Sequence, residues 1–201
     1  MTNGESEAEL RRRCEALGSE VGLPAGRGFE VPWERAEAAL GTRLPLSYKV
    51  FIEYFGPGGF AEELQYFTPG IENSAYELDY CVRRDHSRSL APTPHGDLSY
   101  SIFPEPDGLL LFETLPEDAV YWDTSIGGPD DWPIVIPSLN RWMLRYEGDI
   151  ISFVGDLLIE APAIGDVEYD PALMREFTPN DGGYSGGRHP ALMPYSFFRN
   201  S

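Results

Sequence analysis

The sequence predicts an α+β fold, in which a twisted antiparallel sheet of about four or more strands packs against helices. Near the N-terminus, apolar residues recur at the i, i+3, i+4, i+7 spacing of a helix. Between 109 and 148, short runs of β-branched and aromatic residues are separated by turn residues, which is typical of an antiparallel meander. Helical spacing returns after 149. Strands that follow one another directly favour this arrangement over an alternating βαβ fold.

The helical segments are recognised by their apolar stripes. The first places Leu10, Cys14 and Leu17 on one face, and the last begins at Asp149, a residue type that caps helices well. The prolines and small polar residues of 85–97 indicate a loop. The expected helices are 5–17, 32–40, 45–55, 71–84 and one that starts at 149.

A glycine-rich turn, GPGG at 56–59, follows the helix expected at 45–55. A phosphate-binding loop precedes a helix, so that the amides at the helix N-terminus face the anion. Here the glycines come after a helix. Gly56 is therefore expected to take a left-handed conformation that ends the helix, and Pro57 prevents the helix from resuming. We interpret the turn as a stop signal rather than a ligand loop.

The strand segments are short and are joined by turn sequences such as LPED and SIGGPDD. In the last of them Trp142, Leu144 and Tyr146 alternate on one face, which suits a strand better than a helix. Phe51, on the helix 45–55, and Trp132, at the start of a strand, are the expected buried anchors of the core. The expected strands are 64–67, 109–113, 119–124, 132–138 and 141–148.

The chain divides into three parts by composition. Residues 1–29 form an N-terminal helix and linker, 30–160 form the folded domain, and 161–201 form an irregular C-terminal extension rich in glycine and proline. Only two cysteines occur, which indicates reduced thiols rather than a disulfide framework. The N-terminus lacks the features of a secretion signal, so we expect a cytoplasmic protein.

No pattern of catalytic or metal-ligating residues stands out. The histidines His86, His95 and His189 share no metal-ligand spacing, and Asp85 beside His86 is a weak candidate dyad. Adjacent acids occur in expected turns, where carboxylates are normally solvated, and no calcium-loop, serine-nucleophile or nucleotide-loop motif is present. We therefore expect no catalytic residue, no metal and no cofactor. This favours a binding module.

Charge is the strongest compositional feature. The formal net charge is −18, and residues 105–131 contain eight acids and no base. Such a surface repels nucleic acid and anionic membranes and attracts cationic proteins, although solubility alone also explains exposed acids. Asp123 is the least promising of these acids, because it can instead bond a turn. We expect the turns at 115–118 and 125–131 to form two separate acidic patches. The candidate partner-binding residues are Glu105, Asp107, Glu117, Asp118, Asp130 and Asp131.

Several motifs follow one another along about 30–160: Leu40-Gly41, Leu44-Pro45, the glycine turn at 56–59 and Trp122-Asp123. In this order they resemble the SUKH superfamily, which includes fungal cell-wall regulators and many bacterial immunity proteins. The similar segments run from the tryptophan at 33 through the glycine turn to the later strands and the closing helix. The resemblance implies an α+β domain, and the matching residues look structural rather than catalytic. They are Trp33, Glu37, Leu40, Gly41, Leu44, Pro45, Tyr48, Phe51, Gly56, Gly59, Trp122, Asp123 and Trp132.

The resemblance also implies function. Bacterial members often bind and neutralise a toxin, frequently a nuclease, whereas fungal members serve as scaffolds. The leading interpretation is an immunity protein whose acidic surface binds a basic toxin domain. The alternatives are an adaptor or scaffold with a regulatory partner, and an enzyme of unrecognised type. The oligomeric state is open.

Overall fold

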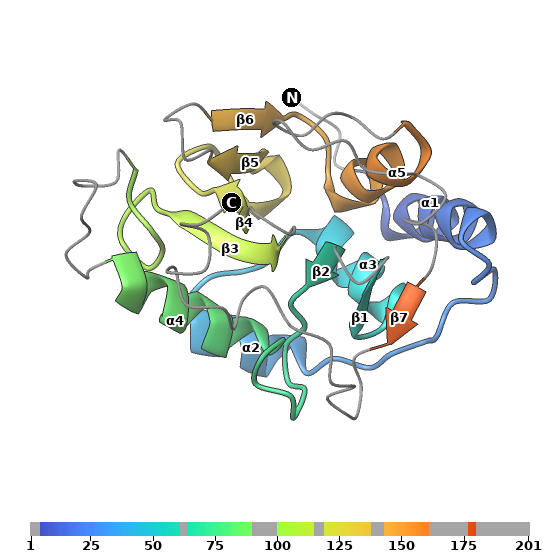
Figure 1. Ribbon diagram of the computed structural model, residues 1–201, viewed down its shortest axis with the longest axis horizontal. Helices are drawn as coiled ribbons and strands as arrows, with labels where there is room; N and C mark the ends of the chain where they lie inside the picture. The colour runs from blue at the N-terminus through green and yellow to red at the C-terminus, as the bar shows by residue number, and fades with distance from the viewer. Residues whose placement is uncertain are drawn as a thin grey trace, which may run out of the picture.

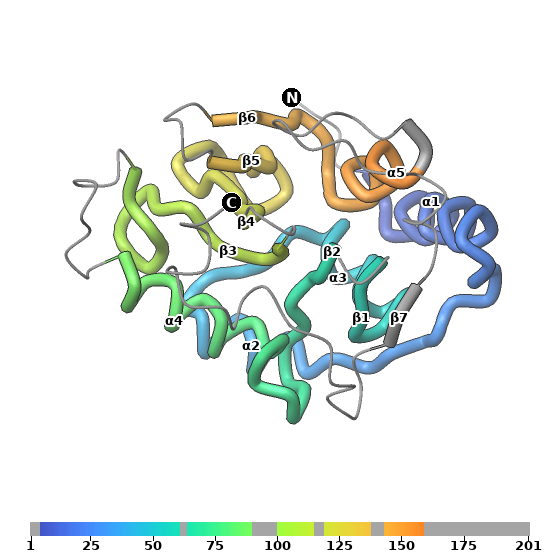
Figure 2. The backbone as a smooth tube through the Cα atoms, viewed as in Figure 1, coloured from blue at the N-terminus to red at the C-terminus, as the bar shows by residue number. Residues whose placement is uncertain are grey.

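The computed structural model describes residues 5–60, 64–89, 100–114, 119–137, 143–160 and 177–179, and Figure 2 traces their path. The helices in these ranges are α1 (Glu7–Glu20), α2 (Trp33–Leu40), α3 (Leu46–Phe55), α4 (Leu78–Ser89), α5 (Ile150–Glu160) and the short 3-10 helix η1 (Pro129–Asp131). The strands are β1 (Gly58–Phe60), β2 (Leu64–Tyr66), β3 (Leu109–Thr114), β4 (Ala119–Asp123), β5 (Ile134–Pro137), β6 (Met143–Tyr146) and β7 (Phe177–Pro179). The predicted α+β fold is confirmed.

The strands form one sheet in the order β6-β5-β4-β3-β2-β1-β7, and every neighbouring pair is antiparallel (Figure 1). From β1 to β6 this order follows the chain, so the sheet is the meander that the sequence predicts, extended by strands that were not expected. Neighbouring strands that are consecutive in sequence need only short connections. β6 and β7 lie at the two ends of this order.

Helices cover both faces of the sheet. Tyr121 and Trp122 are consecutive residues of β4, so their side chains point to opposite faces. Tyr48 of α3 packs edge-on against Trp122, with ring centroids 5.0 Å apart. Tyr121 instead hydrogen-bonds Asp85 of α4. α3 therefore lies on one face, where it packs against α1 and α5, and α4 lies on the other, beside α2 (Figure 1).

The core between α3 and the sheet is rich in aromatic rings. Phe51 is fully buried, as predicted, and packs against Phe55 and Tyr66 with centroids 4.7 and 5.0 Å apart. Contacts of this kind between rings add to the stabilisation from burial. Trp132 is only partly buried, so the prediction that it is a core anchor is wrong, because it lies in the link between η1 and β5 rather than within the strand.

The link from α2 to α3 is held by the residues that carry the family resemblance. Gly41 ends α2 with φ 77° and ψ 13°, a left-handed conformation that glycine adopts without strain. Glu37 accepts a hydrogen bond from the Leu44 amide at 2.9 Å and pairs with Lys49. Partial burial pushes the pKa of Glu37 upward, but the bonds from Lys49 and Leu44 outweigh it and lower the pKa below its usual value.

Gly56 ends α3, and the stop signal is confirmed. Its amide donates to the Ile52 carbonyl at 2.8 Å, and its carbonyl accepts from the Tyr66 hydroxyl at 2.9 Å. Its φ is positive as predicted, at 71°, but its ψ of −175° is extended rather than left-handed helical. This region of backbone conformation is essentially restricted to glycine. The turn leads the chain directly into β1.

Helix α4 differs from the prediction at both ends. It was expected over 71–84, but it begins at Leu78, because Asn73 forms a local turn in which its side chain accepts from the Ala75 amide at 3.2 Å. It continues to Ser89, through residues expected to form a loop. The hydroxyl of Ser87 donates to the carbonyl of Arg83 four residues earlier, so this polar side chain is hydrogen-bonded within the helix.

Two strands were not predicted, and one of them lies in the extension expected to be irregular. β7 pairs with β1 in the register Gly58↔Pro179 to Phe60↔Phe177. Three-residue strands that contain glycine and proline give no alternating apolar pattern, so sequence periodicity does not reveal them. At the other end of the chain, Leu10, Cys14 and Leu17 of α1 belong to the same buried cluster as the sheet.

Candidate functional site

Four of the six candidate acids lie in two loops at one end of the β3–β4 hairpin. Glu105 and Asp107 precede β3, and Asp130 and Asp131 follow β4. Leu109 is opposite Asp123 in the hairpin register, so these loops leave the same end of the sheet. We call this group of four residues the acidic end. All four are exposed.

The acidic end is held in shape by hydrogen bonds between and within its loops. The Thr124 hydroxyl donates to the Gly108 carbonyl at 2.7 Å, which joins the loop after β4 to the loop before β3. The Gly108 amide donates to the Glu105 carbonyl at 3.0 Å. Asp107 has a φ of 58°, a conformation in which aspartate is better tolerated than most residues. The carboxylates of the acidic end are therefore carried by loops whose backbone is held by hydrogen bonds.

Asp130 also has a structural contact. Its carboxylate accepts a hydrogen bond from the Leu46 amide at 2.6 Å, at the first residue of α3. The residue before the helix, Pro45, provides no side-chain cap, so Asp130 supplies one from a distant part of the sequence. Within η1, Asp131 accepts from the Gly128 amide at 3.4 Å. Asp130 is thus more than a solvated acid.

Asp123 bonds a turn, as expected. Its Oδ1 accepts from the amide of Ser125 at 3.1 Å and from the Ser125 hydroxyl at 2.5 Å. Its Oδ2 lies 3.6 Å from the Arg145 guanidinium of β6. A base for the stretch 105–131, which has none in its own sequence, therefore comes from β6, two strands away from β4 in the sheet. The charge of that stretch is partly neutralised in the folded chain.

The remaining candidates, Glu117 and Asp118, lie outside the described residues. The strand ends that flank them, Thr114 and Ala119, are paired at the opposite end of the hairpin from Leu109 and Asp123. The division of the candidate acids into two patches stays a prediction.

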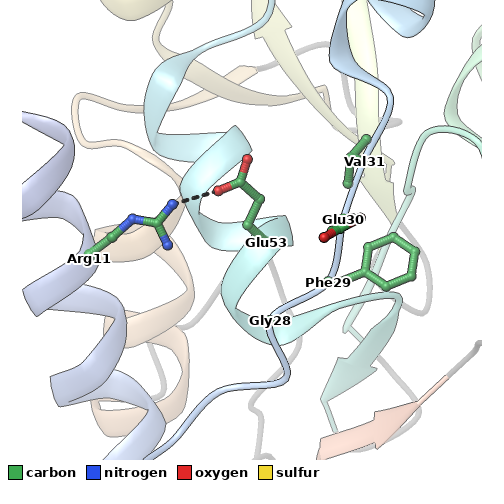
Figure 3. Close-up of a pocket in the computed structure, with 6 residues that line it drawn as sticks. All are labelled: Arg11, Gly28, Phe29, Glu30, Val31 and Glu53. Carbon is green, nitrogen blue, oxygen red and sulfur yellow. Dashed lines mark hydrogen bonds and ion pairs between the residues drawn. The ribbon is translucent and has the colours of Figure 1, made fainter.

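A hollow of about 470 Å³, which no sequence pattern predicted, lies beside α1 and α3 (Figure 3). The lining residues are Arg11, Gly28, Phe29, Glu30, Val31 and Glu53. The two carboxylate oxygens of Glu53 accept from Arg11 and from the Trp33 indole, both at 2.8 Å. Two of the three charged residues in its wall, Arg11 and Glu53, pair with each other, so the hollow shows no set of groups poised for chemistry.

The suspected Asp85–His86 dyad does not form. His86 instead has its Nε2 3.4 Å from the Glu105 carboxylate. Asp85 points into the molecule, and burial raises its pKa to about 6 although the bond from Tyr121 opposes the shift.

The cysteines offer no activated nucleophile. Burial raises the pKa of both thiols, Cys14 and Cys81, to about 12, which keeps them protonated and unreactive at neutral pH. Within the described ranges, no group of three or more histidine, cysteine or acidic side chains is arranged to hold a metal ion. In the same ranges, no helix has both the length and the apolar character needed to cross a membrane.

Comparison with known proteins agrees with the geometry. A family model described as SUKH_6, SMI1-KNR4 cell-wall, matches residues 31–144, which is more than half of the chain. The match spans α2, the aromatic core of α3 and the strands β1 to β5. No curated protein and no solved structure matches the chain. The chain therefore belongs to the SUKH superfamily.

Proposed function

We propose that this protein is a cytoplasmic immunity protein that neutralises a cognate toxin by tight binding, without catalysis of its own. The observation that carries the proposal is the acidic end, where four exposed carboxylates lie on ordered loops of a chain with a net charge of −18. Membership of the SUKH superfamily is consistent with a protein-binding module of this type.

The chemistry of the acidic end favours a basic protein as partner. Nuclease active sites are basic because they hold phosphates, and an acidic surface competes for the same electrostatic field while it accelerates association. A nuclease toxin is therefore the partner class that the charge fits best. The acidic end repels nucleic acid itself, so the protein would act on the enzyme and not on its substrate.

The proposal is tested by isolating the partner and measuring its activity. The tagged protein is purified from native cells, a stoichiometric partner is identified by mass spectrometry, and the partner's cleavage of DNA and RNA is measured with increasing amounts of the tagged protein. We expect cleavage to stop at about one equivalent, as tight binding requires. A partner that keeps full activity in the presence of excess protein would contradict the proposal and would favour a scaffold.

A further inference from the structure

The buried carboxylic acid Glu113 serves none of the roles described above. It lies in β3, between Tyr66 of β2 and Val120 of β4, and its side chain is fully buried. The register of β3 and β4 shifts between Leu111 and Glu113, as at a β-bulge. Without the shift, Glu113 would share the face of Leu111.

The shift turns Glu113 toward α3. Val120 and Trp122 are two residues apart on β4, so they point to the same face of the sheet. That face is the one covered by α3, since Trp122 packs on Tyr48. Glu113 is opposite Val120 and shares its face. The carboxyl group therefore lies inside the aromatic core.

The carboxyl group has no hydrogen-bond partner among the described residues, for either oxygen. Two phenols interact with it electrostatically, those of Tyr48 in α3 and Tyr66 in β2. Each phenol has a single proton to donate, and each already donates it to a backbone carbonyl. The Tyr48 hydroxyl donates to Phe67 at 2.5 Å, and the Tyr66 hydroxyl donates to Gly56 at 2.9 Å.

The charged and titratable groups around these phenols include two acidic groups and one cation. Glu77 and Cys81 interact electrostatically with Tyr48, and both raise the pKa of its phenol. Arg27 interacts electrostatically with Tyr66 and opposes the rise in the pKa of its phenol. Its guanidinium donates to the Pro57 carbonyl at 3.2 Å. Burial is the cause that raises the pKa of Glu113, from the usual 4.5 to about 8.

We propose that Glu113 is held as a neutral acid in the folded core and makes the packing of α3 on the sheet sensitive to pH. A buried carboxylate without a partner is strongly unfavourable, so the folded chain keeps the proton and the unfolded chain releases it. Folding then takes up a proton at neutral pH. The contribution of Glu113 to the free energy of unfolding is therefore greatest in acid and is lost in alkaline solution.

The direction and range of the effect follow from the two pKa values, 4.5 unfolded and about 8 folded. Below pH 4.5 Glu113 is protonated in both states, and its full contribution to stability is present. Between 4.5 and 8 only the folded state holds the proton, so stability falls as pH rises. Above 8 both states are ionised and the loss is complete. The unfolding equilibrium constant should rise roughly 3,000-fold over this range on account of Glu113.

The test compares the wild type with Glu113→Gln, a neutral side chain of the same shape. Denaturant unfolding is measured from pH 5 to 9, and the ratio of the two unfolding equilibrium constants isolates Glu113 from other titrating groups. We expect this ratio, wild type over variant, to rise by roughly 700-fold, mostly below pH 8. A ratio that stays constant with pH would overturn the proposal. Glu113→Met replaces the amide variant if that variant does not fold.

Infrared spectroscopy of the folded protein provides a second readout. At pH 7 Asp85, with a pKa of about 6, is mostly ionised, whereas Glu113 should still be protonated. We expect a protonated-carboxyl C=O band in the wild type that disappears by pH 10 and is missing from the variant. Absence of this band from the wild type at pH 7 would overturn the proposal even if no variant folds.

Discussion

Removing the Asp130 carboxylate should weaken α3, although Asp130 is exposed and remote from this helix in the sequence. Its Oδ1 accepts from the Leu46 amide at 2.6 Å, and this amide is one of those that a helix leaves unpaired at its N-terminus. Loss of a capping side chain costs about 1 kcal/mol, and loss of a negative charge at this end of the helix dipole adds about 0.5 kcal/mol. We therefore expect Asp130→Ala to destabilise the fold by about 1.5 kcal/mol.

The assay is thermal and denaturant unfolding of a matched set of variants. A loss of this size corresponds to a fall in Tm of about 3–6 °C for a chain of this length. Asp130→Asn keeps an oxygen acceptor and should lose only about 0.5 kcal/mol, the contribution of the charge.

Glu105→Ala is the control for this prediction, because it removes a carboxylate from the same acidic end, away from any helix N-terminus. Its pairing with His86 is exposed and long, at 3.4 Å, so its loss should have little effect on stability. If Asp130→Ala and Glu105→Ala melt at the same temperature, the long-range cap does not stabilise α3 and the reasoning fails.

Three further predictions follow from the fold. Gly56→Ala should cost about 2–3 kcal/mol because its backbone conformation is nearly exclusive to glycine, whereas Gly41→Ala, in an ordinary left-handed conformation with open space around it, should cost about 1 kcal/mol; equal losses in denaturant unfolding would contradict this. Phe51→Ala should cost about 3–5 kcal/mol and Trp132→Ala about 2 kcal/mol, because only the first ring is fully buried; the reverse order would mean that the core is wrongly assigned. A chain that ends at Pro179 should melt cooperatively because it keeps β7, and one that ends at Glu160 should melt at a lower temperature; aggregation of the longer chain would show that 180–201 is part of the fold.

The sequence predicted the fold class and most elements because their signals are local. The apolar stripe of α3 and the alternation in β6 depend on residues a few positions apart, and Phe51 could be placed in the core from this spacing alone. The turn formed by Asn73 and the pairing of β7 with β1 were missed. The turn forms because the Asn73 side chain takes a backbone amide that a helix would otherwise use. The strand pairing joins residues more than a hundred positions apart.

The candidate site was less predictable than the fold. Sequence alone could place the acids in turns, but it could not show which of them also make structural contacts. The Asp130 contact with α3 and the Arg145 contact with Asp123 each join segments that are distant along the chain. The bulge that turns Glu113 into the core likewise has no local signature, because an acid in a strand normally indicates an exposed face.

The central claim, that the acidic end recruits a basic protein, is tested most directly by association rates of the isolated partner at low and high salt. The test variant is Glu105→Lys with Asp107→Asn, which spares the Asp130 cap and avoids lysine at the positive φ of Asp107. The control, Glu15→Lys with Glu20→Gln, makes the same charge change on α1. Glu15 interacts electrostatically with Tyr54, near the C-terminus of α3, whereas Asp130 contacts the N-terminus of that helix. The control therefore changes charge away from the acidic end.

We predict that the test variant associates about tenfold more slowly than the wild type in dilute buffer, that the difference shrinks as salt is added, and that the control changes the rate much less. Equal slowing by both pairs would mean that only net charge matters. An unchanged rate for the test variant would show that the partner binds elsewhere and would contradict the claim.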